Sequence, residues 1–229
     1  METKSIDSIL QQKMEGEVKI RGWIHHKRTL GKINFLLIRD GTGIIQTTWK
    51  EDLASSLIQL VEKLPVESVV EVFGVARVDE RAPGGVEIVG KDIKVISKAQ
   101  EDYPIARKYH GPEFLLDNRH LWIRNEKMQA MLKIRAGILA YIREWFEKHG
   151  FVEVQAPMII TAACEGGATL FEVNYFGRKA YLTQSSQLYL EAFISSLGKV
   201  YTIAPSFRAE KSRTRRHLTE YWHLSLIHI

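Results

Sequence analysis

Hydrophobic and polar residues alternate along several short stretches of the first hundred residues, and a period of two is typical of strands with one buried face. The strands that this pattern predicts span 18–23, 33–39, 44–49, 69–78 and 86–96. Between the third and the fourth, residues 52–64 carry apolar side chains at helical spacing and stop at Pro65, so they predict a helix.

Three strands, a helix and two strands in this order are typical of the OB-fold, a five-stranded barrel that binds oligonucleotides. We therefore expect an OB-fold domain over residues 1–100. Its first strand is predicted to end at Gly22, where a strand can bend sharply. The sequence Asp40-Gly-Thr-Gly43 predicts the tight turn between the second and third strands.

The second half of the chain has a different pattern. Residues 101–124 show no clear period and contain two prolines, so they predict a linker and hinge. Asn125 is predicted to cap a long amphipathic helix over 126–149, which Gly150 ends. The elements predicted beyond it are a strand at 151–157, a hairpin of 171–176 and 179–183, a helix over 184–198, and two strands around a basic loop. The fold class is thus α+β, with an antiparallel-sheet domain over 125–229.

Composition limits the classes of protein to consider. The 229 residues are 45% hydrophobic and 26% charged, as in ordinary folded proteins, and a net charge of +5 permits a nucleic-acid partner without requiring one. The single cysteine, Cys164, cannot form a disulfide within the chain, and no metal-binding spacing of cysteine and histidine is present. Without a secretory segment or an apolar run of about 20 residues, we expect a cytoplasmic protein with no membrane contact.

The most unusual stretch is the basic one between the last two predicted strands. Its charged residues are Arg208, Glu210, Lys211, Arg213, Arg215 and Arg216, and His217 follows directly. Aromatic and apolar residues flank it on both sides, which predicts two strands joined by a basic loop. Such a loop suits a polyanion such as a nucleoside triphosphate, and a solvated hairpin tip is the alternative.

The predicted barrel carries its own candidate site. Phe35 lies in the middle of the second strand, and Gln46 lies on the third. If both point outward, Phe35 can stack on an unpaired base while Gln46 offers a donor and an acceptor to the edge of that base. Lys27, Arg28 and Lys32 on the preceding loop could hold phosphates. The alternative is that Phe35 belongs to the barrel core.

Polar side chains in the second half suit a small-molecule pocket. Glu165 stands before two glycines, so a ligand ammonium group could approach it closely, although a solvated loop acid is the alternative. Gln184 lies at the end of a predicted strand. Gln187 and Glu191 lie four residues apart, on one face of the helix that follows.

In this order, the pieces resemble the class II aminoacyl-tRNA synthetases of the aspartate/asparagine group. The segments similar to the first and second class II motifs are 126–157, Phe207–Glu210 and Arg216–Glu220. The segments similar to the amino-acid-site signatures and the anticodon-binding barrel are Glu165–Gly167, Gln184–Gln187, Arg21–Trp23, Phe35, Arg39-Asp40 and Gln46. The resemblance covers residues 16–224.

This resemblance implies a two-step reaction. The carboxylate of the amino acid attacks the α-phosphorus of ATP, which gives an aminoacyl-adenylate and pyrophosphate, and the acyl group then passes to the 3′ end of tRNA. Arg208 would be the catalytic residue that bridges the substrate carboxylate and the α-phosphate. Glu210 would accept from the adenine amino group, and Arg216, His217 and Leu218 would hold the rest of the nucleotide.

The resemblance also implies the other binding residues. Glu165 would meet the substrate ammonium group, and Gln184 and Gln187 would lie in the amino-acid pocket. The residues that would bind the tRNA anticodon are Arg28, Phe35 and Gln46.

Two further positions bear on the choice of amino acid. Aspartate enzymes of the group carry a lysine that pairs the substrate carboxylate three positions after their last signature glutamine, and here Leu190 stands at that position. Leucine cannot neutralise a buried carboxylate, whereas Glu191 can accept from a side-chain amide and would repel aspartate. We therefore expect asparagine as the substrate, as in the archaeal-type asparaginyl enzymes. The alternative is helix core for Leu190 and helix surface for Glu191.

The resemblance stops at Leu224. The third class II motif and the acidic ligands of Mg²⁺ are expected beyond the end of this chain, and Ser225–Ile229 does not match the Glu-rich strand of the family. We expect a truncated reading frame that is inactive by itself, and a homodimer through 126–157. The alternative functions are an aspartyl-tRNA synthetase that could charge both tRNAs, an RNA-binding protein without catalysis, and an asparagine synthetase of the same fold. The intact barrel argues against the last.

Overall fold

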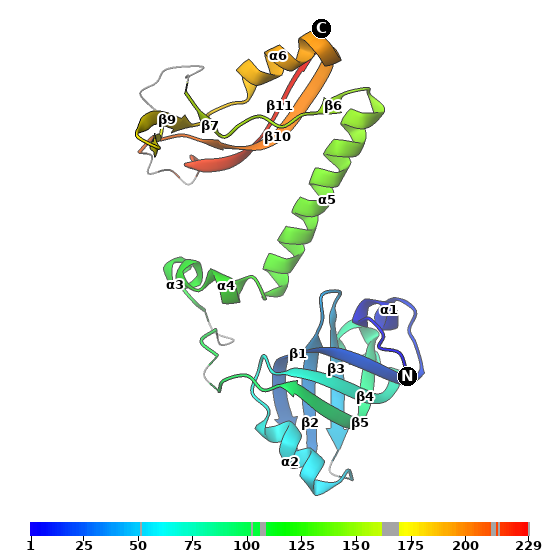
Figure 1. Cartoon of the computed structure of the whole chain (residues 1–229). Coiled ribbons are helices and arrows are strands. Elements are labelled where there is room, and N and C mark those ends of the chain that lie inside the picture. The colour runs from blue at the N-terminus through cyan, green and yellow to red at the C-terminus, as the bar shows by residue number, and fades with distance from the viewer. Residues whose placement is uncertain are drawn as a thin grey trace. The chain divides into compact units, whose positions relative to one another are not determined.

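The computed structural model describes residues 1–50, 52–101, 103–105, 109–161, 170–211, 214 and 216–228. The chain divides into two compact units, Met1–Leu115 and Leu116–Ile229, and each has its own core (Figure 1). The division falls within the stretch predicted as a linker. No helix among the residues described is long and apolar enough to cross a membrane.

The first unit is a closed five-stranded barrel, as predicted. Its strands are β1 (Gly16–Leu30), β2 (Ile33–Arg39), β3 (Ile44–Lys50), β4 (Val69–Val78) and β5 (Val86–Ser97), in the order β1-β2-β3-β5-β4. The parallel pair is β3 with β5, and the other pairs are antiparallel. The predicted helix is α2 (Ser55–Lys63). Two shorter helices, α1 (Ile6–Gln11) and η1 (Pro83–Gly85), are too short for a periodic pattern to predict.

The first strand is longer than predicted. The expectation that it ends at Gly22 is wrong, because β1 continues to Leu30, and its register with β2 shifts only between Ile24 and His26. Gly22 instead allows the two strands to approach closely, since a Cβ atom there would lie 2.3 Å from the carbonyl oxygen of Arg39. Packing within the barrel, not a bend, therefore requires this glycine.

The barrel interior decides the orientation of Phe35. Leu36 and Ile38 of β2 are buried in the core, and neighbouring residues of a strand point to opposite faces. Phe35 therefore lies on the outer face, where it is half-buried, and the alternative that it is a core residue is excluded. The largest core side chain is Trp49, which lies so close to Gly90 that a Cβ atom there would come within 2.7 Å of its ring.

Helices open the second half of the chain. The short helices α3 (Pro112–Asp117) and α4 (Arg119–Trp122) lie in the predicted linker, and the long helix α5 (Glu126–Lys148) follows. Asn125 caps α5 as predicted, because its side chain accepts a hydrogen bond from the Lys127 amide at 2.9 Å. The last turns of α5 bury Phe146 against Tyr201.

The described residues of the second unit also form two three-stranded sheets. One has the order β11-β10-β6 and is built from β6 (Val152–Glu153), β10 (Lys199–Phe207) and β11 (Glu220–His228). The other has the order β7-β9-β8 and is built from β7 (Ile159–Ile160), β8 (Glu172–Tyr175) and β9 (Arg178–Leu182). Helix α6 (Gln187–Leu197) packs on the first sheet through Leu190.

Strand lengths in this unit differ from the prediction. The strand expected over 151–157 is too long, because only the two residues of β6 pair with β10, in parallel. The segment ends at Pro157, which has no N–H to donate to a ladder. In contrast, β10 and β11 pair along their whole length, from Lys199 with His228 to Phe207 with Glu220. This long hairpin carries the basic loop at its end.

Candidate functional site

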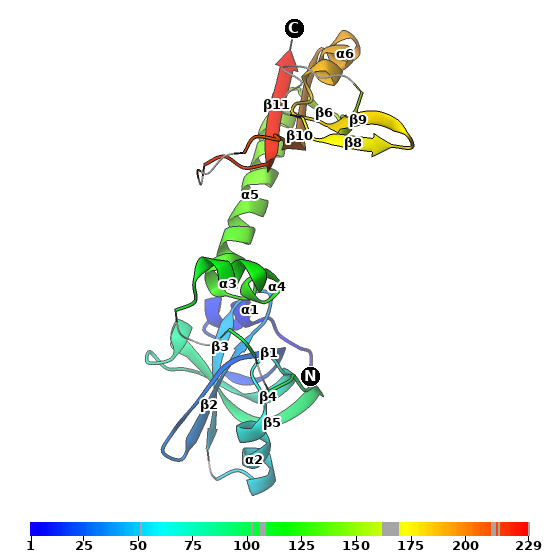
Figure 2. The same cartoon turned by 90° about the vertical axis from the view of Figure 1, so that its left-hand side faces the viewer.

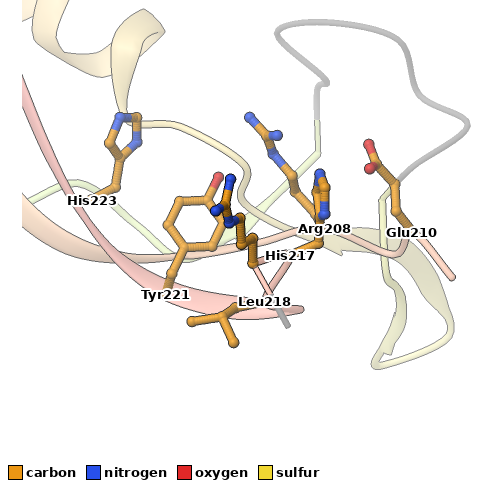
Figure 3. Close-up of a pocket in the computed structure, with 7 residues that line it drawn as sticks. Arg208, Glu210, His217, Leu218, Tyr221 and His223 are labelled. Carbon is orange, nitrogen blue, oxygen red and sulfur yellow. The ribbon is translucent and has the colours of Figure 1, made fainter. Parts of the chain in front are cut away.

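A pocket of about 410 Å³ opens at the end of the β10–β11 hairpin. It is lined by Arg208, Glu210, Arg216, His217, Leu218, Tyr221 and His223 (Figure 3). The five residues predicted to bind the nucleotide therefore come together in one place. Two arginines, two histidines and one acid beside Leu218 and Tyr221 suit a ligand that carries phosphates and an aromatic base.

The hairpin fixes the position of Arg208. Its amide donates to the carbonyl oxygen of Thr219 at 2.9 Å, directly beyond the last strand pair of Phe207 with Glu220. The guanidinium carbon lies 5.7 Å from the centre of the Tyr221 ring, within the range of a cation–π contact. The ladder thus holds the backbone and Tyr221 orients the side chain, while no side chain among the described residues takes up the N–H groups of the guanidinium.

A short turn positions His217. Its Nδ1 atom contacts the hydroxyl group of Thr214, and its amide donates to the Thr214 carbonyl oxygen at 3.4 Å. Three residues of the prediction, Glu165, Arg213 and Arg215, lie outside the residues that the structure describes.

Sequence reasoning missed two residues of the pocket, Tyr221 and His223. They occupy alternate positions of β11, so both side chains leave the same face of the strand. The Nδ1 atom of His223 is buried and has no hydrogen-bond partner among the described residues, which marks it as a group that a ligand or water can satisfy. The period of two along β11 predicts that both residues share one face of the strand, but it does not show that this face lines the pocket.

The residues predicted for the amino acid follow β9. The Thr183 carbonyl oxygen accepts from the Phe207 amide at 2.9 Å, which brings the segment entering Gln184 against the end of β10. Gln187 and Glu191 share a helix face as predicted, because Gln187 Nε2 donates to Glu191 Oε1 at 3.0 Å. Both side chains are exposed and free to reorganise around a ligand.

Leu190 is a core residue. It is fully buried with Val154 and Val200, and it does not line the pocket beside Arg208. This is the helix-core alternative for that position. Leu190 would affect the choice of amino acid only because it places no charge at this point of α6. This role stays a prediction.

The three predicted anticodon residues lie next to one another on the barrel, where Phe35 is half-buried and Gln46 is buried beneath its partners, at 5% exposure. The guanidinium carbon of Arg28 lies 4.7 Å from the centre of the Phe35 ring, and Arg28 Nη2 donates to Gln46 Oε1 at 3.3 Å. Gln46 Nε2 in turn donates to Glu87 Oε2 at 3.0 Å, and Glu87 pairs with Arg77. The sequence did not indicate Glu87 and Arg77, because only the folded barrel pairs β5 with β3 and β4 with β5.

Lys27 has a different role from the one predicted. Instead of facing a phosphate, its ammonium group donates to the carbonyl oxygens of Glu62 and Leu64, at 2.9 and 3.0 Å. These carbonyls lie at the C-terminal end of α2, where a cation is favoured. As for metals, no cluster of three or more His, Cys, Asp or Glu side chains within the described ranges could hold an ion.

The first unit is thus a five-stranded barrel, and the second carries a polar pocket at the end of an antiparallel hairpin. The family of OB-fold nucleic acid binding domains matches residues 18–96, and the family described as tRNA synthetases class II (D, K and N) matches residues 111–227. The chain belongs to these class II tRNA synthetases.

Within this family, the relatives in sequence include asparagine–tRNA ligases. That of Desulforamulus reducens is 46% identical over 213 residues, which are 93% of this chain and 49% of the relative. That of Thermococcus kodakarensis is 47% identical over 214 residues, again 93% of this chain and 49% of the relative. The chain thus spans about half the length of the curated relatives it matches.

Solved structures show the same similarity. The structure of asparaginyl-tRNA synthetase from Pyrococcus horikoshii, complexed with asparaginyl-adenylate, matches this chain with a TM-score of 0.91 and 45% identity. The match covers 99% of this chain and 53% of the synthetase chain. A putative aspartyl-tRNA synthetase from Leishmania major has a TM-score of 0.81 but only 26% identity, over 96% of this chain and 46% of that one.

Proposed function

We propose that the protein represented by this chain ligates asparagine to its tRNA, with ATP as the second substrate and an aminoacyl-adenylate as the intermediate. The observation that carries the proposal is the pocket at the end of the β10–β11 hairpin, where Arg208 lies with Glu210, Arg216 and His217. The similarity to a synthetase complexed with asparaginyl-adenylate, at 45% identity, supports the same reading.

In the first step, the Arg208 guanidinium bonds one oxygen of the asparagine carboxylate and one oxygen of the ATP α-phosphate. The carboxylate attacks the α-phosphorus, the acyl–phosphate bond forms, and pyrophosphate leaves with the electron pair of the broken P–O bond. Charge on the α-phosphate oxygens is neutralised by the planar fork of the guanidinium. Because the carboxylate is itself the nucleophile, alignment and charge neutralisation are the main contributions of the protein.

The other pocket residues hold the nucleotide. Glu210 accepts a hydrogen bond from the adenine amino group, and Arg216 and His217 neutralise the phosphates that leave. Leu218 gives an apolar contact beside them. Tyr221 keeps Arg208 in place through the cation–π contact.

Selection of asparagine rests on polar groups together with an uncharged residue, Leu190, at the position where aspartate enzymes carry a lysine. Glu165 bonds the substrate ammonium group, and Gln184 and Gln187 line the amino-acid side of the site. Glu191, which Gln187 holds at 3.0 Å, accepts from the side-chain amide of asparagine. Aspartate is rejected because its second carboxylate would meet Glu191 without a compensating cation.

The barrel surface reads the anticodon. An unpaired base stacks on Phe35 in the place that Arg28 occupies here, and Arg28 turns to a phosphate. Gln46 bonds the edge of the base, and Glu87 holds the amide of Gln46 in the required orientation.

Three further parts complete the proposal. Magnesium ions would neutralise the charge of the triphosphate. Homodimerisation uses 126–157, where α5 exposes Met131, Ile138 and Tyr141. The protein acts in the cytoplasm.

Replacing Arg208 by lysine tests the catalytic proposal. In a protein of the relatives' full length that begins with these residues, Arg208→Lys should lower kcat for asparagine-dependent ATP–pyrophosphate exchange by roughly 10²–10³-fold, because an ammonium group is one point charge instead of a fork. Lys211→Ala, in the same loop but outside the pocket lining, should leave exchange nearly unchanged. If ATP–pyrophosphate exchange requires aspartate instead of asparagine, the protein is an aspartyl-tRNA synthetase. If the protein binds tRNA but shows no exchange, it is an RNA-binding protein without this activity.

Replacing Phe35 tests the anticodon surface. Phe35→Ala should weaken binding of an anticodon stem-loop RNA by about 1–3 kcal/mol, measured by titration, because one stacked base is lost. Leu37→Ala, on the same outer face of β2, should have little effect. Equal losses for the two variants would contradict a stacking role.

A further inference from the structure

We propose that the tip of the β8–β9 hairpin is a second RNA contact, where Phe176 stacks on an unpaired nucleotide near the 3′ end of the tRNA. This inference rests on the proposed function, because it concerns the tRNA that the protein would charge. Figure 2 shows the hairpin extending away from strands β10 and β11. Its tip is formed by Tyr175, Phe176 and Gly177 between the two strands.

The tip presents aromatic surface to solvent. Phe176 is 92% exposed, and its ring meets the half-exposed Tyr175 ring edge to face at 4.8 Å. No core cluster includes either ring within the described residues. Two adjacent aromatic rings that contribute nothing to the core are typical of a contact surface.

The backbone conformation at Phe176 also indicates an external contact. Its φ is +51° and that of Gly177 is +81°, which is the geometry of a two-residue hairpin turn with both central residues left-handed. Asparagine, aspartate or glycine is favoured at such a position, and a bulky ring is unusual. Asn174 Oδ1 accepts from the Gly177 amide at 2.9 Å and so holds the tip. Phe176 therefore serves neither the turn nor the core, and an external contact accounts for its presence.

The charges beside the tip identify the partner as a polyanion. Arg178 follows directly, is exposed, and has no ion-pair partner in the described part of the chain. Lys179 lies 3.2 Å from Glu172, and both side chains are largely exposed, so a phosphate can compete for the lysine. Stacking surface next to cations is how proteins bind single-stranded nucleic acid without sequence preference.

The base of the hairpin connects this tip to the pocket. The Thr183 carbonyl, directly after β9, accepts from the amide of Phe207, which precedes Arg208. The five residues of β9 span roughly 17 Å at about 3.4 Å per residue. An RNA strand whose 3′ end reaches the adenylate at Arg208 therefore passes within reach of Phe176 over its last few nucleotides.

The test compares Phe176→Asn with Phe176→Trp in the 229-residue chain. The probe is an acceptor-arm hairpin RNA with a fluorescent 2-aminopurine in its unpaired 3′ end. Asparagine removes the ring but suits the left-handed backbone, so folding should be retained, whereas tryptophan keeps a stacking ring. We expect Phe176→Asn to weaken binding about five-fold or more and to abolish the stacking quench, and Phe176→Trp to bind within about two-fold of the original chain. A blunt-ended hairpin should bind all three chains equally.

Each other outcome overturns the inference. If Phe176→Asn binds the 3′-tailed RNA normally while anticodon stem-loop binding still depends on Phe35, the tip does not contact the acceptor end and the proposed function stands. If binding of the 3′-tailed RNA does not depend on Phe176 and binding of the anticodon stem-loop does not depend on Phe35, the tRNA part of the proposed function fails as well. If Phe176→Asn changes only the oligomeric mass in light scattering, the tip is a protein contact.

Discussion

The barrel and the second unit differ in how completely they cover their apolar side chains. The barrel surrounds one continuous core that includes Trp49, Leu36 and Ile38, and its closed sheet has no free edge. The described residues of the second unit form two clusters of three buried side chains each, while Trp145 and Trp222 are 53% exposed. The barrel is therefore stable through its own contacts, whereas the second unit presents apolar surface that suits further protein contacts.

The two candidate sites follow the same contrast. On the barrel, Glu87 already holds the amide of Gln46, so this part of the proposed RNA-binding face is organised before a ligand arrives, and Arg28 is the group that has to move. In the pocket, the buried nitrogen of His223 has no partner among the described residues, and Arg208 keeps donors for an anion. A surface that recognises a base needs polar groups held in a fixed geometry. A pocket that binds a charged substrate needs donors and acceptors whose partners come from the substrate.

Removing a large side chain from each unit would test the contrast most strongly. Trp49→Ala should destabilise the barrel by about 3–5 kcal/mol, because it empties the space against Gly90 and removes the bond from its Nε1 to Thr47. Trp145→Ala on the exposed face of α5 should cost about 1 kcal/mol or less. Hydrogen exchange resolved by segment, in the full chain, measures each effect on its own unit. Similar losses in the two units would show that the second is as well packed as the barrel.

An ion pair in each unit gives a second comparison. Glu67 bonds both terminal nitrogens of Arg39, at 2.9 and 3.0 Å, and each side chain is only 5% exposed. Glu67→Gln leaves Arg39 buried without its counter-charge and should cost about 3 kcal/mol of unfolding free energy. The exposed pair of Glu144 with Lys148 on α5 should contribute about 0.5 kcal/mol, so Glu144→Gln is the matched control.

Urea denaturation followed by segment-resolved hydrogen exchange checks both variants. A loss below about 1 kcal/mol for Glu67→Gln would mean that water reaches Arg39 in the folded barrel. In that case the interior of the barrel near Arg39 would be more accessible to water than the burial of its core residues indicates.

The sequence predicted the barrel well because local patterns define it. Strands 33–39 and 69–78 match β2 and β4 residue for residue, since alternation and turn residues are local signals. The role of Gly22 could not be predicted, because the Arg39 carbonyl that requires it lies on another strand. His223 was missed for a similar reason: it lines the pocket only because β11 starts at Glu220 in register with Phe207. Contacts between distant segments carry this information, and a single sequence does not show them.

The smallest effect concerns Asp40, which joins α1 to the β2–β3 turn. Its Oδ2 accepts from the Ile6 amide at 2.9 Å, and its Oδ1 accepts from the amides of Thr42 and Gly43 at 2.7 and 2.8 Å. Burial alone would raise the pKa of Asp40, but the hydrogen bond that the Thr42 hydroxyl donates, together with these three backbone bonds, outweighs burial and holds the pKa below its ordinary value. A lowered pKa in the folded state stabilises the barrel above the unfolded value of about 3.9, and this contribution is lost as the pH falls through the folded pKa.

Asp40→Asn should therefore cost about 1 kcal/mol at pH 7, because a charged acceptor is replaced by a neutral amide. The difference from the original chain should shrink as the pH falls through the lowered pKa of folded Asp40, where Asp40 itself becomes protonated. Urea midpoints of the barrel at several pH values measure this, with the exposed Asp52→Asn as the control. A difference that is the same at every pH would assign the effect to hydrogen-bond geometry and not to charge. A change in the second unit would show that the two cores are not independent.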